Sequence, residues 1–407
     1  APPVLSALLD FSEGWVAAFR LAAKQWKSPR NRTIAERLEE AVPSIRDYLL
    51  GDVVARLRSP LVDFLVDTSI LHRLSTPLCD AVRDATDSGQ ILRELEHENA
   101  FIEPAPGEPA AFRLHGLLHR ALLDELTTTD PERCRELHRR AARWFHATGH
   151  EIDAMHHTAE AGDIDDAWRT FESHWLDRVL AGDVLTVLGW TRILARLSHL
   201  DVARASQLAI ALLILRRPTQ AEHFVVKPTF LHETGDEEHA PMLEVARCLH
   251  AMSRGSFDVA IAHAEAARVG LGEPHAIVWR RLRMSVALSF VLSFADRIDE
   301  ARAELDSAAR DDDPTSPLDA VVFPTARASL ALTEARLAEA DDLADRAIEA
   351  GRTLPRAARS VLCEAHYIKA FVALERNDLD IAEQHFNRCV TSGEALAYAH
   401  VRVLVRL

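Results

Sequence analysis

The sequence predicts a mostly α-helical protein with one small β-hairpin and an array of helical hairpins in its second half. Three observations lead to this fold class. Long helical patterns rich in alanine, leucine and charged residues fill most of the 407 residues, and aromatic residues contribute only 6%. Small residues recur about every forty positions. A Pro/Gly turn around Gly107 separates two short apolar runs.

The repeat is defined by four columns of residues. Alanines recur at intervals of 39, 41, 39 and 42 residues; small residues lie twelve positions before and seven after them, and apolar residues three before. The columns are Ala221, Ala260, Ala301, Ala340, Ala382; Ala209, Cys248, Ser289, Ala328, Ala370; Pro228, Ala267, Ala308, Ala347, Cys389; and Pro218, Phe257, Ile298, Leu337, Leu379. Small residues at matched points let two helices approach closely, and the apolar residues fill the remaining gaps.

Short loops separate the expected helices, for example 254–256 and 376–378, where Gly, Asn and Asp tolerate a tight backbone. We therefore expect five helix-loop-helix units from about residue 201. They form a tetratricopeptide-like α-solenoid with repeats longer than the usual length of about 34 residues.

The segment ahead of the array predicts a winged-helix module. Residues 1–45 carry amphipathic helices, and Pro43 and Ser44 open a helical run over 45–72. The next elements are a helix, two strands and a helix, at 91–99, 100–104, 111–115 and 116–127. Three helices followed by a hairpin describe a winged helix in which the hairpin is the wing.

Four segments follow from this order. We expect the helical end of a nucleotide-binding module at 1–45 and a winged-helix domain at 46–128. A helical connector at 129–200 and a truncated helical-hairpin sensor domain at 201–407 follow. The chain begins without methionine and stops inside a helical pattern, so we expect a fragment.

Composition narrows the class of protein. A formal net charge of −15 gives no electrostatic footprint for nucleic acid. No apolar run approaches the roughly 20 residues that a membrane span requires, and no secretory signal pattern is present. The five cysteines are far apart and include no C-x-x-C pair, so we expect buried, reduced thiols and a cytoplasmic location.

Four motifs occur in an order typical of one family. They are Glu13–Trp15, Tyr48–Val54, Phe112–His115 and His156–Asp163. In this order and spacing the chain resembles the large ATP-dependent LuxR-type (MalT-like) transcriptional regulators, which are signal-transduction ATPases.

The resemblance implies a P-loop nucleotide-binding domain, a winged helix, a helical-repeat sensor for an inducer and a C-terminal helix-turn-helix. In such regulators ATP and inducer favour self-association, whereas the ADP-bound form is the monomeric resting state. Here the four lysines follow no glycine, so the P-loop is absent, and no terminal helix-turn-helix is visible. We expect this chain itself to be no enzyme; slow ATP hydrolysis and DNA binding would belong to a longer protein.

His115 is the candidate for nucleotide contact. In the family that the chain resembles, a histidine at the end of the wing touches the phosphates of bound ADP, and a helix N-terminus beside it helps to hold an anion. Gly116 stands where that motif commonly has an aspartate. The alternative is a partly buried wing histidine with a local hydrogen bond.

The candidates for inducer binding mix aromatic and polar character on first helices of the repeats. They are Trp279, Arg280, Arg283, His366 and Tyr367. Flat aromatic faces suit sugars and apolar ligands. Tryptophans such as Trp175 and Trp190 fit a pocket or a core, and spacing alone does not separate the inward from the outward face.

No catalytic or metal site is expected. His156 and His157 lack the spacing of H-E-x-x-H, and Asp311–Asp313 precede Pro314 in a turn. The sequence therefore predicts the signal-sensing region of an ATP-dependent transcription activator, with a small-molecule inducer or a regulatory protein as partner. The alternative is a stand-alone helical-repeat scaffold for protein partners.

Overall fold

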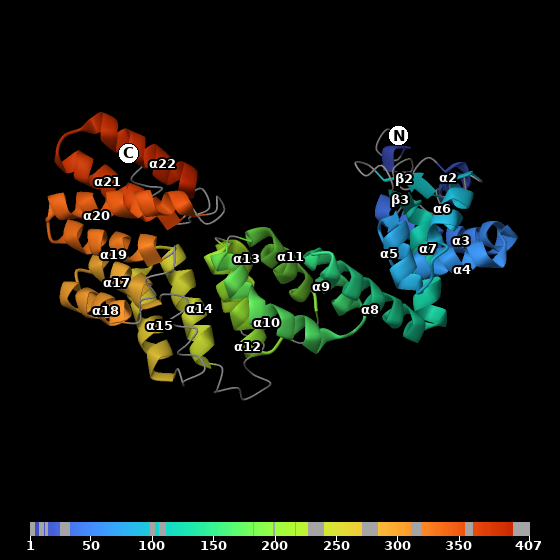
Figure 1. Ribbon diagram of the computed structural model, residues 1–407, viewed down its shortest axis with the longest axis horizontal. Coiled ribbons are helices and arrows are strands. Elements are labelled where there is room, and N and C mark those ends of the chain that lie inside the picture. The colour runs from blue at the N-terminus through green and yellow to red at the C-terminus, as the bar shows by residue number, and fades with distance from the viewer. Residues whose placement is uncertain are drawn as a thin grey trace. The chain divides into compact units, whose positions relative to one another are not determined.

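The computed structural model describes residues 5–7, 12, 15–24, 33–97, 102–105, 111–181, 183–197, 200–215, 217–226, 240–270, 284–310, 319–354 and 361–393. It divides into two compact units, residues 1–167 and 168–407 (Figure 1). Helices dominate both units, and the predicted fold class is confirmed. Among the described residues, no helix combines the length and apolar character needed to cross a bilayer.

The first unit contains α2 to α9, a three-stranded sheet and the start of α10. The helices are α2 Val16–Lys24, α3 Ile34–Tyr48, α4 Ser59–Thr68, α5 Thr76–Arg83, α6 Ser88–His97, α7 Gly116–Thr129, α8 Pro131–Ala147 and α9 Glu151–Glu160; the strands are β1 Leu74–Ser75, β2 Ile102–Pro104 and β3 Ala111–Leu114. A π-helical turn, Leu49–Val53, and a 3-10 turn, Val54–Arg56, follow α3.

Helix α3 begins earlier than the sequence pattern predicts. A capping box starts it: the Glu36 amide donates to the Thr33 hydroxyl, and the Thr33 amide donates to the Glu36 carboxylate at 2.7 Å. The helix then runs through Pro43, so the predicted start at Pro43 and Ser44 is wrong. Burial of Ala41 and Ile45, at 0% and 1% exposure, anchors both sides of the proline against the lost hydrogen bond.

The predicted wing is confirmed as the β2–β3 hairpin, with Ile102 opposite Leu114 and Pro104 opposite Phe112. The sheet has the order β1-β3-β2, because β1 pairs with the other edge of β3, Leu74 opposite Phe112. A strand of two residues is too short to produce an alternating pattern, which is why the sequence did not reveal β1.

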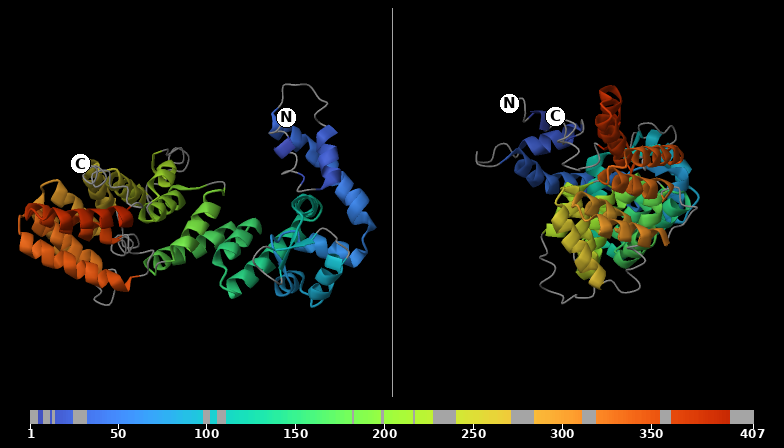
Figure 2. Two further views of the ribbon diagram at one scale, coloured as in Figure 1. Left: turned by 90° about the horizontal axis from the view of Figure 1, so that it is seen from above. Right: turned by 90° about the vertical axis from the view of Figure 1, so that its left-hand side faces the viewer.

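The second unit is built from helical pairs. Its helices are α10 Ile164–Leu180, α11 Val184–Leu194, α12 Val202–Ile214, α13 Pro218–Val226, α14 Ala240–Ser253, α15 Phe257–Gly270, α17 Met284–Phe294, α18 Ile298–Arg310, α19 Asp319–Thr333, α20 Leu337–Ala350, α21 Cys363–Glu375 and α22 Leu379–Gly393; a 3-10 turn, Gly351–Thr353, follows α20. The pairs α17–α18, α19–α20 and α21–α22 lie stacked in chain order in Figure 1, and the orange and red helices lie side by side in the left view of Figure 2.

The five predicted helix-loop-helix units from about residue 201 are confirmed as α12–α13, α14–α15, α17–α18, α19–α20 and α21–α22. The five repeat alanines are at most 2% exposed, and the residues twelve positions earlier are at most 1% exposed. Each member of the apolar column is the first residue of its second helix. One expectation for that column is wrong: Leu379 fills no gap, because 62% of it is exposed. Pro228 lies outside the described residues.

The loops of these pairs close in the same way. The residue five positions before the repeat alanine is left-handed: Gly255, Asp296, Ala335 and Asn377 have φ values of 72°, 59°, 56° and 59°. The next amide donates back to a carbonyl of the first helix, as from Ser256 to Ala251 at 3.0 Å. A left-handed residue at this point turns the chain sharply enough for the second helix to return along the first.

The same register also describes α8 and α9. Gly149 is left-handed with φ 78°, and Glu151 begins the second helix. Ala154 takes the place of the repeat alanine, with Ala142 twelve positions before it and Ala161 seven after it, all at most 9% exposed. In α10–α11 the corresponding residues are Trp175 and Val187, also buried. The larger side chains of Trp175 and Val187 hide the relation of α10–α11 to the repeat in the sequence.

Candidate functional site

His115 joins the wing to the helix behind it. Strand β3 ends at Leu114 and helix α7 begins at Gly116, so His115 is the residue that precedes the first turn of the helix. Its backbone is extended, with φ −56° and ψ 130°, and its side chain does not cap the helix. The first-turn amides of α7 therefore point toward the end of the wing on which His115 stands.

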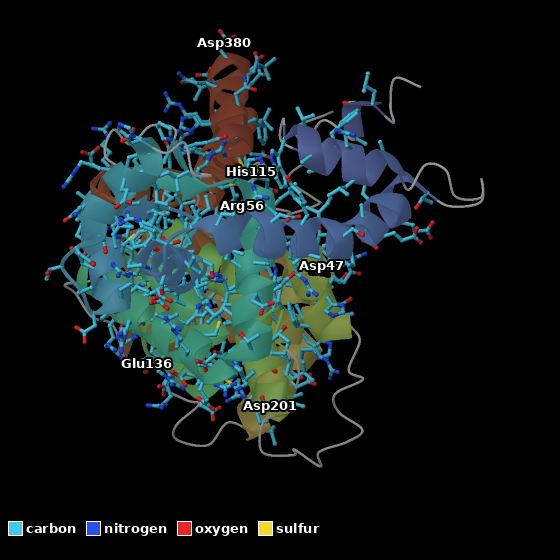
Figure 3. The ribbon with its side chains drawn as sticks, turned by 90° about the vertical axis from the view of Figure 1, so that its right-hand side faces the viewer. Asp47, Arg56, His115, Glu136, Asp201 and Asp380 are labelled. Atoms are coloured by element: carbon cyan, nitrogen blue, oxygen red, sulfur yellow. The ribbon has the colours of Figure 1, made fainter. Side chains whose placement is uncertain are left out.

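An aromatic group surrounds this histidine. The ring of Trp15 meets the ring of His115 edge to face, with centroids 6.2 Å apart and planes at 66°. Trp15 also contacts Tyr48, with centroids 5.6 Å apart. Residues from three of the four sequence motifs thus come together at the end of the wing, where Figure 3 labels His115. The motifs predicted each residue separately but not their contact.

The chemistry of this place suits an anion. The N-terminus of a helix carries partial positive charge, and an imidazole beside it donates a hydrogen bond when it is protonated or in the matching tautomer. A phosphate group is one of the anions that such a terminus binds.

A row of five histidines extends from the winged helix into α8 and α9. Successive ring centroids are 5.4, 6.3, 5.1 and 5.0 Å apart, in the order His119, His72, His156, His157 and His138. Burial, followed by the neighbouring histidines, lowers the pKa of His138 to about 4 and of His157 to about 2. These two imidazoles are therefore neutral at neutral pH. Within the described ranges, no three His, Cys, Asp or Glu side chains are arranged to hold a metal ion.

Paired polar side chains cross the helical pairs at one fixed position. Nδ1 of His138 lies 2.9 Å from Nδ1 of His157, and the same atoms of His366 and His385 are 3.1 Å apart. Nδ1 of His263 contacts the Glu244 carboxylate at the equivalent position of α14–α15. The spacing of 19 residues shared by the three pairs is the sequence signal that would have found them.

The inducer-binding candidates fall into two groups. Trp279, Arg280 and Arg283 lie outside the described residues. His366 and Tyr367 lie in α21 at 7% and 6% exposure, where His366 meets His385 and Tyr367 meets Phe371 at 4.7 Å. Both side chains are buried, His366 against α22 and Tyr367 in an apolar cluster that includes residues of α19 and α20, and their contact with an inducer stays a prediction.

The two other tryptophans weighed for a pocket are also buried. Trp175 stacks on Phe171 at 6.0 Å, and the guanidinium of Arg178 lies 5.0 Å from the Trp190 ring. Their exposures are 5% and 1%. They pack in α10–α11 as core residues.

Ion pairs join neighbouring helical pairs. Arg254 reaches Glu222 at 3.9 Å, and Arg376 reaches Asp341 of the preceding pair at 2.6 Å. Lys369 also contacts Asp341. Burial raises the pKa of the Asp341 carboxyl, but the charges of Lys369 and Arg376 outweigh that effect and the pKa is lowered. Asp341 is thus held ionised as a structural link.

Known proteins resemble parts of this chain. Residues 50–134 match the MalT winged helix domain family. The serine/threonine-protein kinase PknK of Mycobacterium tuberculosis is 31% identical over 221 residues, which cover 53% of this chain and 20% of the kinase. The HTH-type transcriptional regulator MalT of Vibrio parahaemolyticus is 27% identical over 246 residues, 58% of this chain and 26% of the regulator.

The MalT regulator of Yersinia pestis is 29% identical over 194 residues, 45% of this chain and 21% of the regulator. The chain thus spans about a fifth to a quarter of the length of the relatives it matches. The resemblance indicated by the four motifs is confirmed: the chain is similar to the MalT-like regulators, and its residues 50–134 match the MalT winged helix domain family.

Proposed function

We propose that this chain is the signal-sensing and regulatory region of an ATP-dependent transcription activator. The winged helix and its preceding helices contact a nucleotide-binding module, and the helical pairs bind a small-molecule inducer or a regulatory protein. Binding then controls self-association of the activator. The proposed role of the chain is regulatory and not catalytic.

One observation carries this proposal. The end of the wing brings His115, Trp15 and the N-terminus of α7 together, and helical pairs that share one register follow it along the chain. The wing offers a point for anion binding, and the helical pairs offer a surface for a ligand or a partner protein. An inducer changes the activity only if it binds the resting and active arrangements with different free energies.

The relatives support a sensing module that can be joined to different effector domains. About half of this chain is similar to a protein named as a kinase, and about half is similar to proteins named as HTH-type transcriptional regulators. We propose that this chain senses a signal, while a separate part of the full-length protein delivers the response. The regulator reading is preferred here because the winged helix matches the MalT family.

The test is made on the full-length protein. In His115→Ala, we expect inducer-independent transcription to rise about tenfold and bound ADP to dissociate faster, because the coupling between two sites is typically about 1–3 kcal/mol. Arg113→Ala is the matched control, since Arg113 lies two residues earlier on β3, is exposed and pairs with Glu103. Unchanged basal transcription and unchanged ADP retention in His115→Ala would contradict the assignment.

The second candidate is a scaffold that docks protein partners without nucleotide. Exposed apolar side chains around the α21–α22 turn favour it: Leu374, Leu379 and Ile381 are 39%, 62% and 44% exposed. Equilibrium dialysis of the full-length protein with ADP separates the two candidates. Binding supports the regulator, and its absence supports the scaffold.

A further inference from the structure

Two thiols meet inside the α21–α22 pair. Sγ of Cys363 lies 2.9 Å from Sγ of Cys389, and the side chains are 1% and 0% exposed. Cys363 is the first residue of α21, and Cys389 lies in the last turns of α22. The contact is therefore at the open end of the hairpin, opposite the turn formed by residues 376–378.

Packing of the fold does not require sulfur at this position. The equivalent residues of α19–α20 are Val321 and Ala347, both fully buried in one apolar cluster. A small apolar residue thus serves the same position in the neighbouring pair. The two cysteines add to this packing a pair of groups that can react with each other.

The other three cysteines have no thiol beside them. Cys248 has the thioether of Met252 at 3.9 Å, and Cys134 has the hydroxyl of Thr127 at 3.8 Å. Burial raises the pKa of Cys79 and of Cys248 to about 12, so these thiols are poor nucleophiles in the folded chain. All five cysteines are described, and only Cys363 and Cys389 are brought together.

We propose that Cys363 and Cys389 form a reversible disulfide that responds to hydroperoxides. One thiolate attacks the peroxide oxygen, which gives a sulfenic acid and releases water or an alcohol. The second thiol attacks this sulfur and expels water, so the two thiols lose two hydrogens while the peroxide is reduced. The sulfur atoms need to approach by about 0.9 Å to reach a bonding distance of about 2.0 Å.

The disulfide would close the hairpin at both ends. The turn already joins α21 to α22 at one end, and the new bond joins them at the other, across 26 residues. Separation of α21 from α22 would then become rare. A ligand that binds only when the two helices are apart would therefore bind with lower affinity. Because the thiols are buried, the peroxide reaches them only when the pair opens locally.

The test treats the folded, full-length chain with hydrogen peroxide, alkylates the remaining thiols and maps the peptides by mass spectrometry. We expect a disulfide-linked Cys363–Cys389 peptide whose mass is about 2 Da below the sum of the two reduced peptides. Dithiothreitol should restore the two separate peptides. Cys79, Cys134 and Cys248 should remain reduced and become alkylated. Amide exchange in α21 and α22 should slow about tenfold or more in the oxidised chain.

Two comparisons make the result decisive. Cys248→Ser, the matched control, should leave the linked peptide unchanged, and Cys389→Ser should abolish it and leave a sulfenic acid on Cys363. If a variant fails to fold, the peptide map of the unsubstituted chain still tests the proposal. The proposal would be overturned if both cysteines are over-oxidised, or if neither reacts, while the circular dichroism stays native. It would also be overturned if the disulfide forms only in denaturant.

Discussion

His138 and His157 meet across the α8–α9 pair with their Nδ1 atoms 2.9 Å apart, at the same hairpin position where His366 meets His385. One imidazole of each pair must donate and the other accept, which requires the accepting imidazole to be neutral. The pairs thus couple the packing of two helices to the protonation of buried groups.

The first prediction concerns pH. The pKa of His157 is lowered to about 2 by burial and then by the charges of His138, His156 and His72, whereas in the unfolded chain it lies near 6.5. As the pH falls from 7.5 to 5.5, His157 binds a proton in the unfolded state but stays neutral in the folded state. Stability of the first unit therefore falls, by about 1 kcal/mol for each such histidine.

Hydrogen exchange of α8 and α9 at the two pH values measures this loss. In His157→Gln the pH dependence should shrink by about 1 kcal/mol, because one titrating group is removed and a hydrogen-bonding side chain stays. His174→Gln is the control, since His174 is exposed on α10. An unchanged dependence in His157→Gln would refute the assignment.

The second prediction concerns the loop of α19–α20. Ala335 has φ 56°, a left-handed conformation that costs a residue with a Cβ about 1 kcal/mol. We expect Ala335→Gly to raise the free energy of unfolding of the second unit by up to about 1 kcal/mol, as seen by chemical denaturation. The same change at Ala303, exposed in the middle of α18, should lower it by about 1 kcal/mol. Equal effects at both sites would contradict the role of the loop.

The third prediction concerns the repeat alanine of α20. Ala340 is fully buried, and a larger side chain there would force α19 and α20 apart. We expect Ala340→Leu to lower the free energy of unfolding by about 1–3 kcal/mol in a denaturant titration. Ala303→Leu adds the same atoms on an exposed surface and should change stability by no more than about 0.5 kcal/mol. A tolerated Ala340→Leu would mean that the columns do not set the helix spacing.

The fourth prediction concerns a close approach. Gly351 follows α20, and a Cβ added there would overlap the side chain of Leu362, which is 8% exposed and cannot move freely. Gly351→Ala should therefore lower the thermal midpoint, at a cost of about 1–3 kcal/mol. Gly51 has no atom within 4 Å of its added Cβ, so Gly51→Ala should be neutral or stabilising. A stabilised Gly351→Ala would show that this contact relaxes.

The sequence predicts the parts of the fold that repeat or carry turn residues. The alanine columns place the five helical pairs, and Gly107 with its prolines places the wing. It does not predict the path of α3 through Pro43, because tertiary packing of Ala41 and Ile45 overrides the local cost of proline.

The candidate site follows the same division. His115 is placed correctly at the junction of wing and helix, because the strand and helix on either side have clear patterns. Its contact with Trp15 and the contact of His72 with His156 join residues far apart in the chain, and a single sequence carries no signal for such contacts. The burial of His366 and Tyr367 likewise depends on which face of α21 packs inward.

The left-handed loop residues have a consequence for the length of the chain. Asp296 and Ala335 are equivalent joints with the same conformation, and the 39 residues from one to the other contain one complete set of columns. Excision of residues 297–335 would join Asp296 to Arg336 and leave every remaining column in register. Duplication of that segment would lengthen the array by the same rule. The protein is thus divisible at its turns, and its helical array can be made shorter or longer without redesign of any helix.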